Sequence, residues 1–473
     1  MQVRKTYYND SQMTDMNSLT RALMSRPAEL SPAITFLGGR EDKKFPLTML
    51  TEGAGNVKSL DKFEYEYRIQ QRVLQVRPVN ATPAVTANLG IGGSVFELEF
   101  PDAWFIYPYT LVSESGVQAR IMAQPEQTGN GYKYKLKLIN PSPSATMPSS
   151  DVQAGKLFGM LWASVGTDFS RGNASNWSSP GMIRHKFGTI RKSYQMSGNA
   201  KDFVAEFKLP SKNGGTTNMW MDYEEWQKML QWKQESELLY WYGEKTYDAN
   251  GEVQMKDENG QPVTVGPGLF QQIINNDTFS TLTENKLKNI VGDLYYGMTD
   301  ADNMQVTLYT GTGGMRDFDD AMKNALADKS YIKLDNGQFV TGSGRNLTLG
   351  GYFTTYQHID GHVINVVKVP MFDHGPIADS RAKHPVTGFS MESHRMVFVD
   401  QSRYDGEANV QMVQKKGREF LRWAVAGSVV PPGFSGGDLR ASDIDGASVH
   451  FLKTGGIVLK RFDTSLDLQC IAN

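Results

Sequence analysis

Hydrophobic and polar residues alternate along much of residues 61–215, and this pattern is typical of β-strands with one buried face. Phe96–Phe100 alternates at every position. Gln118–Met122 and Tyr132–Ile139 flank a Gly-Asn-Gly turn, so we expect these two segments to pair. Because several short strands follow one another at close spacing, the pattern predicts a small β-domain over residues 85–168.

The pattern changes to a helical period after residue 217. Apolar residues recur every three or four positions on one face of 218–243: Met219, Tyr223, Trp226, Met229, Trp232 and Leu239. Asn218 can cap this segment, and Gly243 can end it. Such a helix spans roughly 39 Å at 1.5 Å per residue, which is long for an ordinary domain.

A mixed helical and extended pattern covers the next part of the chain. Two Asn-Gly turns, at 250–251 and 259–260, predict a β-meander. Thr281 and Glu284 have the spacing of a capping box, which predicts a helix after them. The segment 304–326 is expected to form a strand, a tight Gly-rich loop and a helix that starts at Arg316.

From residue 340 onward the chain is again mostly extended. Asp360-Gly361 has the composition of a two-residue hairpin turn. We expect the last strand pair to be His450–Lys453 and Gly456–Leu459. Residues 1–60, in contrast, are polar and weakly patterned, and we expect an arm that lies against something else.

Composition narrows the class of protein. The 473 residues include one cysteine, Cys470, so we expect neither an intrachain disulfide nor a Cys-rich metal site. Lysine and arginine number 49 against 51 aspartates and glutamates, and the formal net charge of −2 argues against a protein that coats itself with nucleic acid. The chain has no run of about 18 apolar residues, so we expect no membrane partner.

The near-neutral total conceals a local asymmetry. Residues 184–212 hold seven basic side chains against two acidic ones, whereas 222–258 holds ten acidic side chains against four basic ones. These complementary charges could set the register of docking between neighbouring copies, and two solvated faces are the equal alternative. The residues expected at this interface are Arg184, Lys186, Arg191, Lys192, Lys201, Asp222, Glu224, Glu225, Glu235 and Glu237.

Two motifs that could carry chemistry lack the necessary context. Residues 433–437 have the spacing of a nucleophile elbow, but they follow two prolines rather than a strand, which favours a surface loop. The Gly-rich loop at 311–314 could hold a phosphate. The acidic residues after it would repel a phosphate, which favours a tight turn.

The histidine and tryptophan clusters also have structural explanations that require no bound metal or ligand. Five of the seven histidines lie between 358 and 394, but pairing across a two-residue turn would point His358 and His362 to opposite faces. This favours polar surface or interface histidines over a metal site. Four tryptophans lie on the predicted helix, and core or subunit packing is favoured over a stacking platform. We therefore expect no catalytic residue, metal ligand or cofactor.

The order of parts is the most specific feature of the chain: a polar arm, a β-rich excursion, a polar extended segment, a long helix, a meander, a mixed region and returning strands. This order resembles the HK97-like major capsid proteins of tailed bacteriophages. Phrases such as Met396–Ser402 and Arg422–Ser428 are similar to the capsid proteins of crAss-like phages. The resemblance implies an α+β, HK97-like capsid fold with a β-rich insertion.

The resemblance also implies a division of the chain. Its parts would be an N-terminal arm (1–60), the start of the peripheral and extended-loop region (61–84), the β-rich insertion (85–168), an extended-loop hairpin (169–217), a peripheral domain with the spine helix (218–269), an axial domain (270–390) and returning peripheral strands with the C-terminal segment (391–473).

The function that the resemblance implies is structural and non-enzymatic. Copies would self-assemble as hexamers and pentamers into an icosahedral head around double-stranded DNA, in the virion, after assembly in the host bacterial cytoplasm. The partners would be the protein itself, a portal, auxiliary or decoration proteins, and packaged DNA held by weak non-specific contacts. Two alternatives stay open: a carbohydrate-binding receptor or decoration protein that uses the tryptophans, and an α/β enzyme that uses 304–326.

Overall fold

The computed structural model describes most of the chain, and all structural statements below concern that part. The described residues are 57–70, 76–169, 172–176, 179–198, 204–210, 216–296, 305–328, 338–340, 346–348, 355–357, 362–404, 406–431, 434 and 441–471. The predicted arm therefore lies outside them, apart from its last four residues. The chain divides into two compact units: a body unit, Met1–Tyr67 with Arg184–Asn473, and an insert unit, Arg68–Ile183.

The insert unit is an antiparallel sheet in the order β3-β9-β5-β6-β8-β4, with β7 beside β8. Its strands are β3 (Val76–Pro78), β4 (Phe96–Phe100), β5 (Thr110–Ser113), β6 (Gln118–Ile121), β7 (Glu126–Gln127), β8 (Tyr132–Leu138) and β9 (Leu157–Met160), and it holds the 3₁₀ turn η2 (Ile91–Gly93). The predicted pairing is confirmed, since Ile121 lies opposite Leu136. Alternation buries one face, where Phe100 contacts the rings of Phe105 and Phe158 edge-on.

A six-stranded sheet forms one half of the body unit. Its order is β14 (Asn275–Phe279), β26 (Leu466–Cys470), β20 (Met396–Asp400), β15 (Gln305–Thr310), β19 (Val363–Lys368) and β18 (Thr355–Gln357). Helices α5 (Glu284–Leu294) and α6 (Thr312–Asp328) cover one face, where Phe398 is buried. Its neighbour Val397 points to the other face, among residues of α3 (Trp220–Tyr242), α4 (Leu269–Gln272) and the second sheet.

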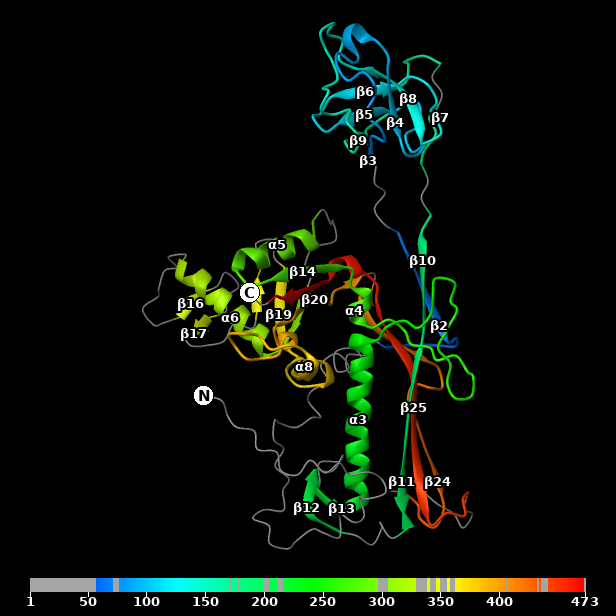
Figure 1. The fold of residues 1–473 in the computed structure, drawn as a ribbon, viewed down its shortest axis with the longest axis vertical. Helices are drawn as coiled ribbons and strands as arrows, with labels where there is room; N and C mark the ends of the chain where they lie inside the picture. The colour runs from blue at the N-terminus through cyan, green and yellow to red at the C-terminus, as the bar shows by residue number, and fades with distance from the viewer. Residues whose placement is uncertain are drawn as a thin grey trace. The chain divides into compact units, whose positions relative to one another are not determined.

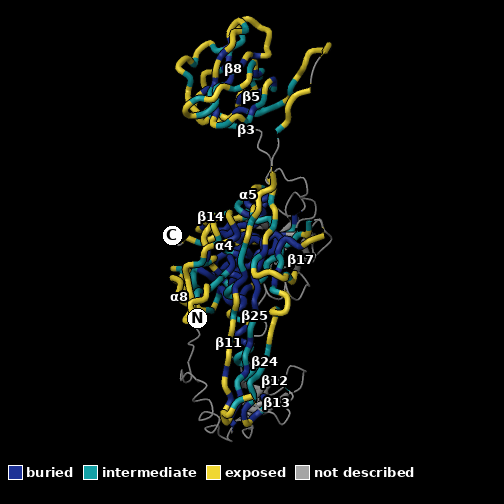
Figure 2. The backbone as a smooth tube through the Cα atoms, turned by 90° about the vertical axis from the view of Figure 1, so that its right-hand side faces the viewer, coloured by how far each residue is buried: buried dark blue, intermediate teal, exposed yellow. Residues whose placement is uncertain are grey.

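The second sheet of the body unit lies beside the longest helix. Its order is β1 (Val57–Leu60), β23 (Val410–Lys415), β25 (Gly446–Leu459) and β11 (Gly188–Ser197), and β24 (Leu421–Ala426) also pairs with β25. Helix α3 (Trp220–Tyr242) runs alongside β11, β24 and β25 (Figure 1). The helix predicted over 218–243 is therefore confirmed. Figure 2 shows the buried residues gathered inside each unit.

Shorter elements complete the described chain. They are β2 (Glu64–Ile69) paired with β10 (Gly181–Lys186), β12 (Val204–Pro210) with β13 (Thr216–Met219), β16 (Gln338–Val340) with β17 (Asn346–Thr348), β21 (Arg403–Tyr404) with β22 (Glu407–Ala408), α7 (Pro370–Asp373), α8 (Pro376–Ser380), η4 (Met391–His394) and η5 (Phe462–Thr464). The α+β class is confirmed by these separate helical and mainly antiparallel parts. None of the described helices has the length and apolar character needed to cross a bilayer.

Two predicted helix starts were wrong. Helix α5 is capped by Thr283, whose side chain accepts a hydrogen bond from the Lys286 amide, and not by Thr281. Helix α6 begins at Thr312, so the Gly-rich segment that was predicted to be a loop forms the first turn. Both errors came from capping patterns, which several nearby residues can satisfy.

Two predicted hairpins were also wrong. The last strand pair is one continuous strand, β25, which runs through Thr454-Gly455-Gly456. Gln357 lies opposite Val363, so the connection between β18 and β19 is longer than the predicted two-residue turn at 360–361.

Candidate assembly surface and buried polar network

Strands β11, β25 and β24 form a ribbon with two chemically different faces. The face toward α3 is apolar, with Tyr194, Met196 and Phe451 buried around Trp232. Because side chains alternate along a strand, Arg191 and Ser193 lie on the other face, which we call the outer face. We predicted that tryptophans of the long helix pack in the core, and this arrangement confirms the prediction for Trp232. It is also confirmed for Trp241, which is fully buried, whereas the side chains of Trp220 and Trp226 lie outside the described residues.

The outer face carries a cation stacked on aromatic rings. The Arg191 guanidinium lies 5.5 Å from the ring centre of Trp423, and that ring stacks on His450 at 5.2 Å. Nε2 of His450 is 3.1 Å from the Ser448 hydroxyl, but its Nδ1 has no hydrogen-bond partner in the described chain. Burial, with Arg191 nearby, lowers the pKa of His450, so this ring is neutral at pH 7. The outer face therefore offers one exposed cation and one aromatic surface, while Nδ1 of His450 is buried beneath them.

Three predicted interface residues, Lys192, Glu225 and Glu235, make ion pairs within the chain. Lys192 lies on the α3-facing side of β11, and its amine is 2.6 Å from the Glu235 carboxylate of α3. Arg422 of β24 pairs with Glu225 of α3 at 2.8 Å. The charge complementarity seen in the sequence thus attaches the ribbon to the long helix.

Three further predicted residues have contacts inside the body unit. Arg184 lies 3.3 Å from the Glu66 carboxylate. The Lys186 amine donates to the Gly251 carbonyl. Glu237 is fully buried and accepts a hydrogen bond of 3.0 Å from the Trp241 indole, so its prediction as an interface residue was wrong. The count of charges along the helix could not show that Glu237 is buried, because this residue lies on the apolar side of α3.

Three further predicted interface residues lie outside the described part of the chain, wholly or in their side chains. Lys201 lies outside the described residues, and so do the side chains of Asp222 and Glu224. The nucleophile-elbow motif at 433–437 is also outside them, apart from Phe434.

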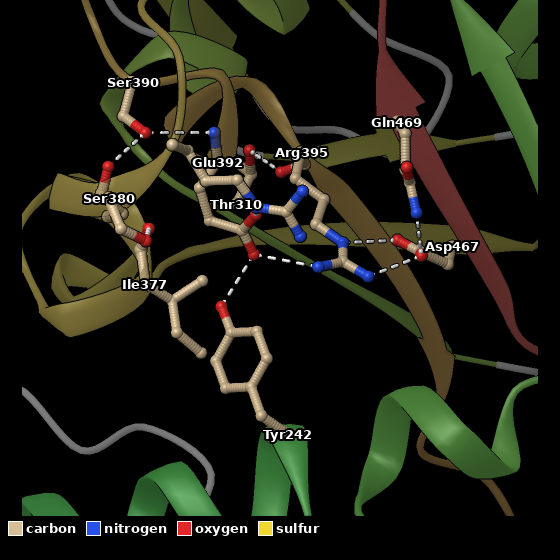
Figure 3. Close-up of polar contacts among 11 residues, drawn as sticks. Tyr242, Thr310, Ile377, Ser380, Ser390, Glu392, Arg395, Asp467 and Gln469 are labelled. Atoms are coloured by element: carbon tan, nitrogen blue, oxygen red, sulfur yellow. Dashed lines mark hydrogen bonds and ion pairs between the residues drawn. The ribbon is translucent and has the colours of Figure 1, made fainter. Parts of the chain in front are cut away.

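A buried ionic network joins the end of α3 to the six-stranded sheet (Figure 3). Arg395 makes a two-pronged contact with Asp467 at 2.7 and 2.6 Å, and its third nitrogen contacts Glu392 at 2.9 Å. The Tyr242 hydroxyl, at the end of α3, donates to the same Glu392 oxygen at 2.7 Å. The Arg395 guanidinium also lies 3.6 Å from the ring centre of Phe270. Each of the three Arg395 nitrogens and the Tyr242 hydroxyl meets a carboxylate oxygen, which makes burial of the charges tolerable.

Protonation states in the network follow from its geometry. Burial, then the Glu392 charge, raises the pKa of Tyr242, so the phenol stays neutral and donates. Gln469 adds a hydrogen bond of 2.9 Å to Asp467. Sequence reasoning missed this network, because its members are far apart in the chain and no local motif links them.

The start of α6 is occupied by a carboxylate of the protein itself. Asp373 accepts hydrogen bonds from the Thr312 amide and the Thr312 hydroxyl, both at 2.6 Å, and from the Ser393 hydroxyl at 2.6 Å. The Lys368 amine is 3.2 Å away. This charge fills the position where a phosphate would bind, so the structure gives no support to a phosphate-binding role for 304–326.

The histidine cluster is more buried than the sequence suggested. His362 is 4% exposed and lies 4.5 Å from the Tyr295 ring, and His394 is 1% exposed and contacts Asp317 at 2.6 Å. The prediction of polar surface histidines was wrong for these two, while His358 lies outside the described residues. Within the described chain, no group of three or more His, Cys, Asp or Glu side chains is placed to hold a metal ion.

One family model matches almost the whole chain. Residues 2–472 match the family described as Crassvirus major capsid protein. The major capsid protein of Bacteroides phage crAss001 is 23% identical over 397 residues, which cover 79% of this chain and 77% of that protein. Among solved structures, the capsid of the native GTA particle has a TM-score of 0.36 at 9% identity, covering 95% of this chain and 96% of that one. The capsid of Myoviridae phage XM1 has a TM-score of 0.33 at 10% identity, covering 94% and 96%.

Proposed function

This chain belongs to the Crassvirus major capsid protein family, and from that membership we propose how its copies join into a shell. The protein is a structural major capsid protein of a phage, and its copies assemble into the capsid of the virion. The single observation that carries this conclusion is the family match, because it runs from residue 2 to residue 472.

The finer description of the shell is part of the proposal. Hexamers and pentamers form an icosahedral head around double-stranded DNA in the host cytoplasm, with a portal and auxiliary or decoration proteins as partners. The parts of the chain keep the roles given above: arm (1–60), insertion (85–168), extended loop (169–217), peripheral domain (218–269) and axial domain (270–390). Many weak contacts made at once would then hold the shell together.

The outer face of the ribbon is our candidate docking surface between copies. Of the predicted basic residues, Arg191 is exposed and is not engaged by a carboxylate in the described chain, while Lys192 is paired with Glu235. An aromatic ring beneath an arginine supplies apolar contact area together with charge. Lys201, Asp222 and Glu224 stay in the proposed interface on the strength of the sequence alone.

The acidic counterpart that we propose is the loop between α3 and α4, where the predicted β-meander is reduced to the isolated bridges Tyr247–Val253 and Lys256–Pro262. Glu252 and Glu258 are exposed there, beside two Asx turns that Asp248 and Asp257 stabilise. These side chains point to solvent from a loop whose backbone is fixed by its own hydrogen bonds. A fixed acidic loop and a fixed basic strand are suited to setting register and encounter rate between copies.

The test is assembly of the full-length chain, observed by negative-stain electron microscopy and sedimentation. We expect closed shells from the natural sequence. Arg191→Glu should reduce the yield of shells by about tenfold, because the lost contact is repeated in every copy, while leaving the melting temperature unchanged. Lys416→Glu is the control for charge reversal, because that side chain is 70% exposed, makes only a 3.9 Å contact with the exposed Asp61 in the described chain, and follows β23 rather than lying in a strand of the ribbon.

A charge swap separates docking from general damage. Adding Glu252→Lys and Glu258→Lys to Arg191→Glu should restore shells if these residues meet across the interface. Normal assembly of Arg191→Glu would remove the docking surface but leave the capsid function intact. A stable small monomer from the natural sequence under every condition tested would contradict the assembly proposal as a whole.

A further inference from the structure

The loop between α8 and η4 is closed around one histidine ring. Nδ1 of His384 lies 3.3 Å from the backbone amides of Val386 and Thr387, and it accepts hydrogen bonds from both. The backbone closes the same loop, because the His384 amide donates to the Phe389 carbonyl at 2.7 Å. Residues 384–389, which we call the His384 loop, therefore fold over a ring nitrogen that acts as an acceptor.

An imidazole nitrogen accepts a hydrogen bond only when it carries no proton. In neutral His384 the proton sits on Nε2 and leaves Nδ1 free to accept from the two amides. Protonation places a hydrogen on Nδ1, so that three donors then face one another. The closed loop is thus compatible with one charge state of His384 and not with the other.

A second histidine holds the first one in place. The buried ring of His394 stacks on His384 with ring centres 4.5 Å apart and an angle of 28°. Its Nδ1 is 2.6 Å from an Asp317 oxygen, which fixes the proton on Nδ1, so its Nε2 accepts from the Thr387 hydroxyl at 2.8 Å. The His394 ring packs closely on the α6 backbone, since a Cβ added at Gly313 would lie 2.7 Å from it.

The two rings respond differently to acid. Asp317 can balance a charge on His394, whose contact with Thr387 survives because that hydroxyl can also accept. No carboxylate contacts His384 in the described chain. The other charged groups around the pair are Arg316 over the Phe389 ring, Lys383 next to His384 in the chain, and Arg381 with Glu392. Apart from Asp317 and Glu392 these are cations.

We propose that His384 and His394 form a pH-sensitive latch, which holds the His384 loop closed while His384 is neutral and releases it in acid. Imidazole is the side chain whose charge changes in the range through which this release would occur. Val386 is 86% exposed at the tip of the loop, so release changes a part of the surface that is already accessible.

Hydrogen exchange of the full-length chain, read by mass spectrometry, tests the latch. Protection of the Val386 and Thr387 amides is compared at pH 7.5 and pH 5.0, after correction for the pH dependence of intrinsic exchange. We expect protection to fall by about tenfold at pH 5.0 in the natural sequence. His384→Asn should keep its protection at both pH values, because an amide oxygen can accept in place of Nδ1 but does not titrate.

Two further variants complete the test. His384→Ala removes the acceptor and should leave the loop unprotected at both pH values. His374→Asn is the matched control, because that exposed histidine of the same region contacts Asp379 at 3.5 Å and lies outside the loop, so it should behave like the natural sequence. Equal protection of the natural sequence at both pH values, or loss in acid that His384→Asn does not prevent, would overturn the latch. Neither result bears on shell assembly, which is tested at neutral pH.

Discussion

At the scale of single residues, His185 shows how burial without a countercharge creates a pH dependence. Its ring lies 5.4 Å from Tyr65, and its Nδ1 is 3.3 Å from the Tyr247 hydroxyl. Burial, reinforced by the positive charge of Lys245, lowers the pKa of His185 from 6.5 to about 4. The unfolded chain therefore takes up a proton at this ring below pH 6.5, whereas the folded chain does so only near pH 4.

The stability of the body unit should fall across that interval. The contribution of the neutral His185 ring to the free energy of unfolding is fully present above pH 6.5. It is lost as the pH drops toward 4. The loss is about 1–3 kcal/mol, because the ring keeps some contact with water. His185→Asn, which cannot titrate, should reduce this loss. The measurement is the urea midpoint at pH 7.5 and 4.5 for both proteins. Parallel losses in the two proteins would show that other groups carry the acid sensitivity.

At the scale of elements, the start of α6 depends on a carboxylate from a different helix. Asp373 of α7 compensates the partial positive charge at the α6 start and accepts from Thr312. Asp373→Asn should therefore lower the free energy of unfolding of the body unit by about 1–3 kcal/mol. Asp379→Asn is the control, because its side chain is 65% exposed, and we expect a change below about 0.5 kcal/mol. Denaturant unfolding compares the two, and equal losses would argue against the capping role.

Elements could be predicted from the sequence where a local period decided them. Helix α3 was found because its apolar residues recur at helical spacing over the whole segment. Strand β25 was divided in two because Gly455-Gly456 resembles a turn. In the structure these glycines serve close approach instead, since an added Cβ at Gly455 would lie 2.9 Å from the Val413 carbonyl oxygen, and one at Gly456 would lie 3.2 Å from the Tyr65 hydroxyl. A turn and a close approach use the same residue, and the local sequence does not distinguish them.

Candidate site residues were less predictable than elements, because counts of charged residues do not show which side chains form ion pairs with one another. The excess of lysine and arginine in 184–212 and of acid in 222–258 was interpreted as docking between copies or as two solvated faces, yet Lys192 and Glu235 meet within one chain. The network of Arg395, Asp467 and Tyr242 has no local signature at all. Such contacts depend on the fold that brings distant segments together.

At the scale of the whole molecule, the described residues form hydrophobic cores that belong to one unit or the other. The core around Phe100 consists of residues 79–158, all in the insert unit. The core around Leu308 consists of residues of the body unit alone. Since neither core shares a member with the other, we expect two separate unfolding transitions in calorimetry of the unassembled full-length chain.

Matched core substitutions identify which transition belongs to which unit. Phe100→Ala should destabilise the insert unit by about 3–5 kcal/mol, because it removes a fully buried ring that three aromatic neighbours contact edge-on. Leu308→Ala should destabilise the body unit by about 2–5 kcal/mol and leave the transition of the insert unit unchanged. The readout is the shift of each calorimetric peak. A single peak that both substitutions shift would mean that the two units unfold as one cooperative body. The insert unit would then contribute to the stability of the body unit, instead of being stable or unstable independently of it.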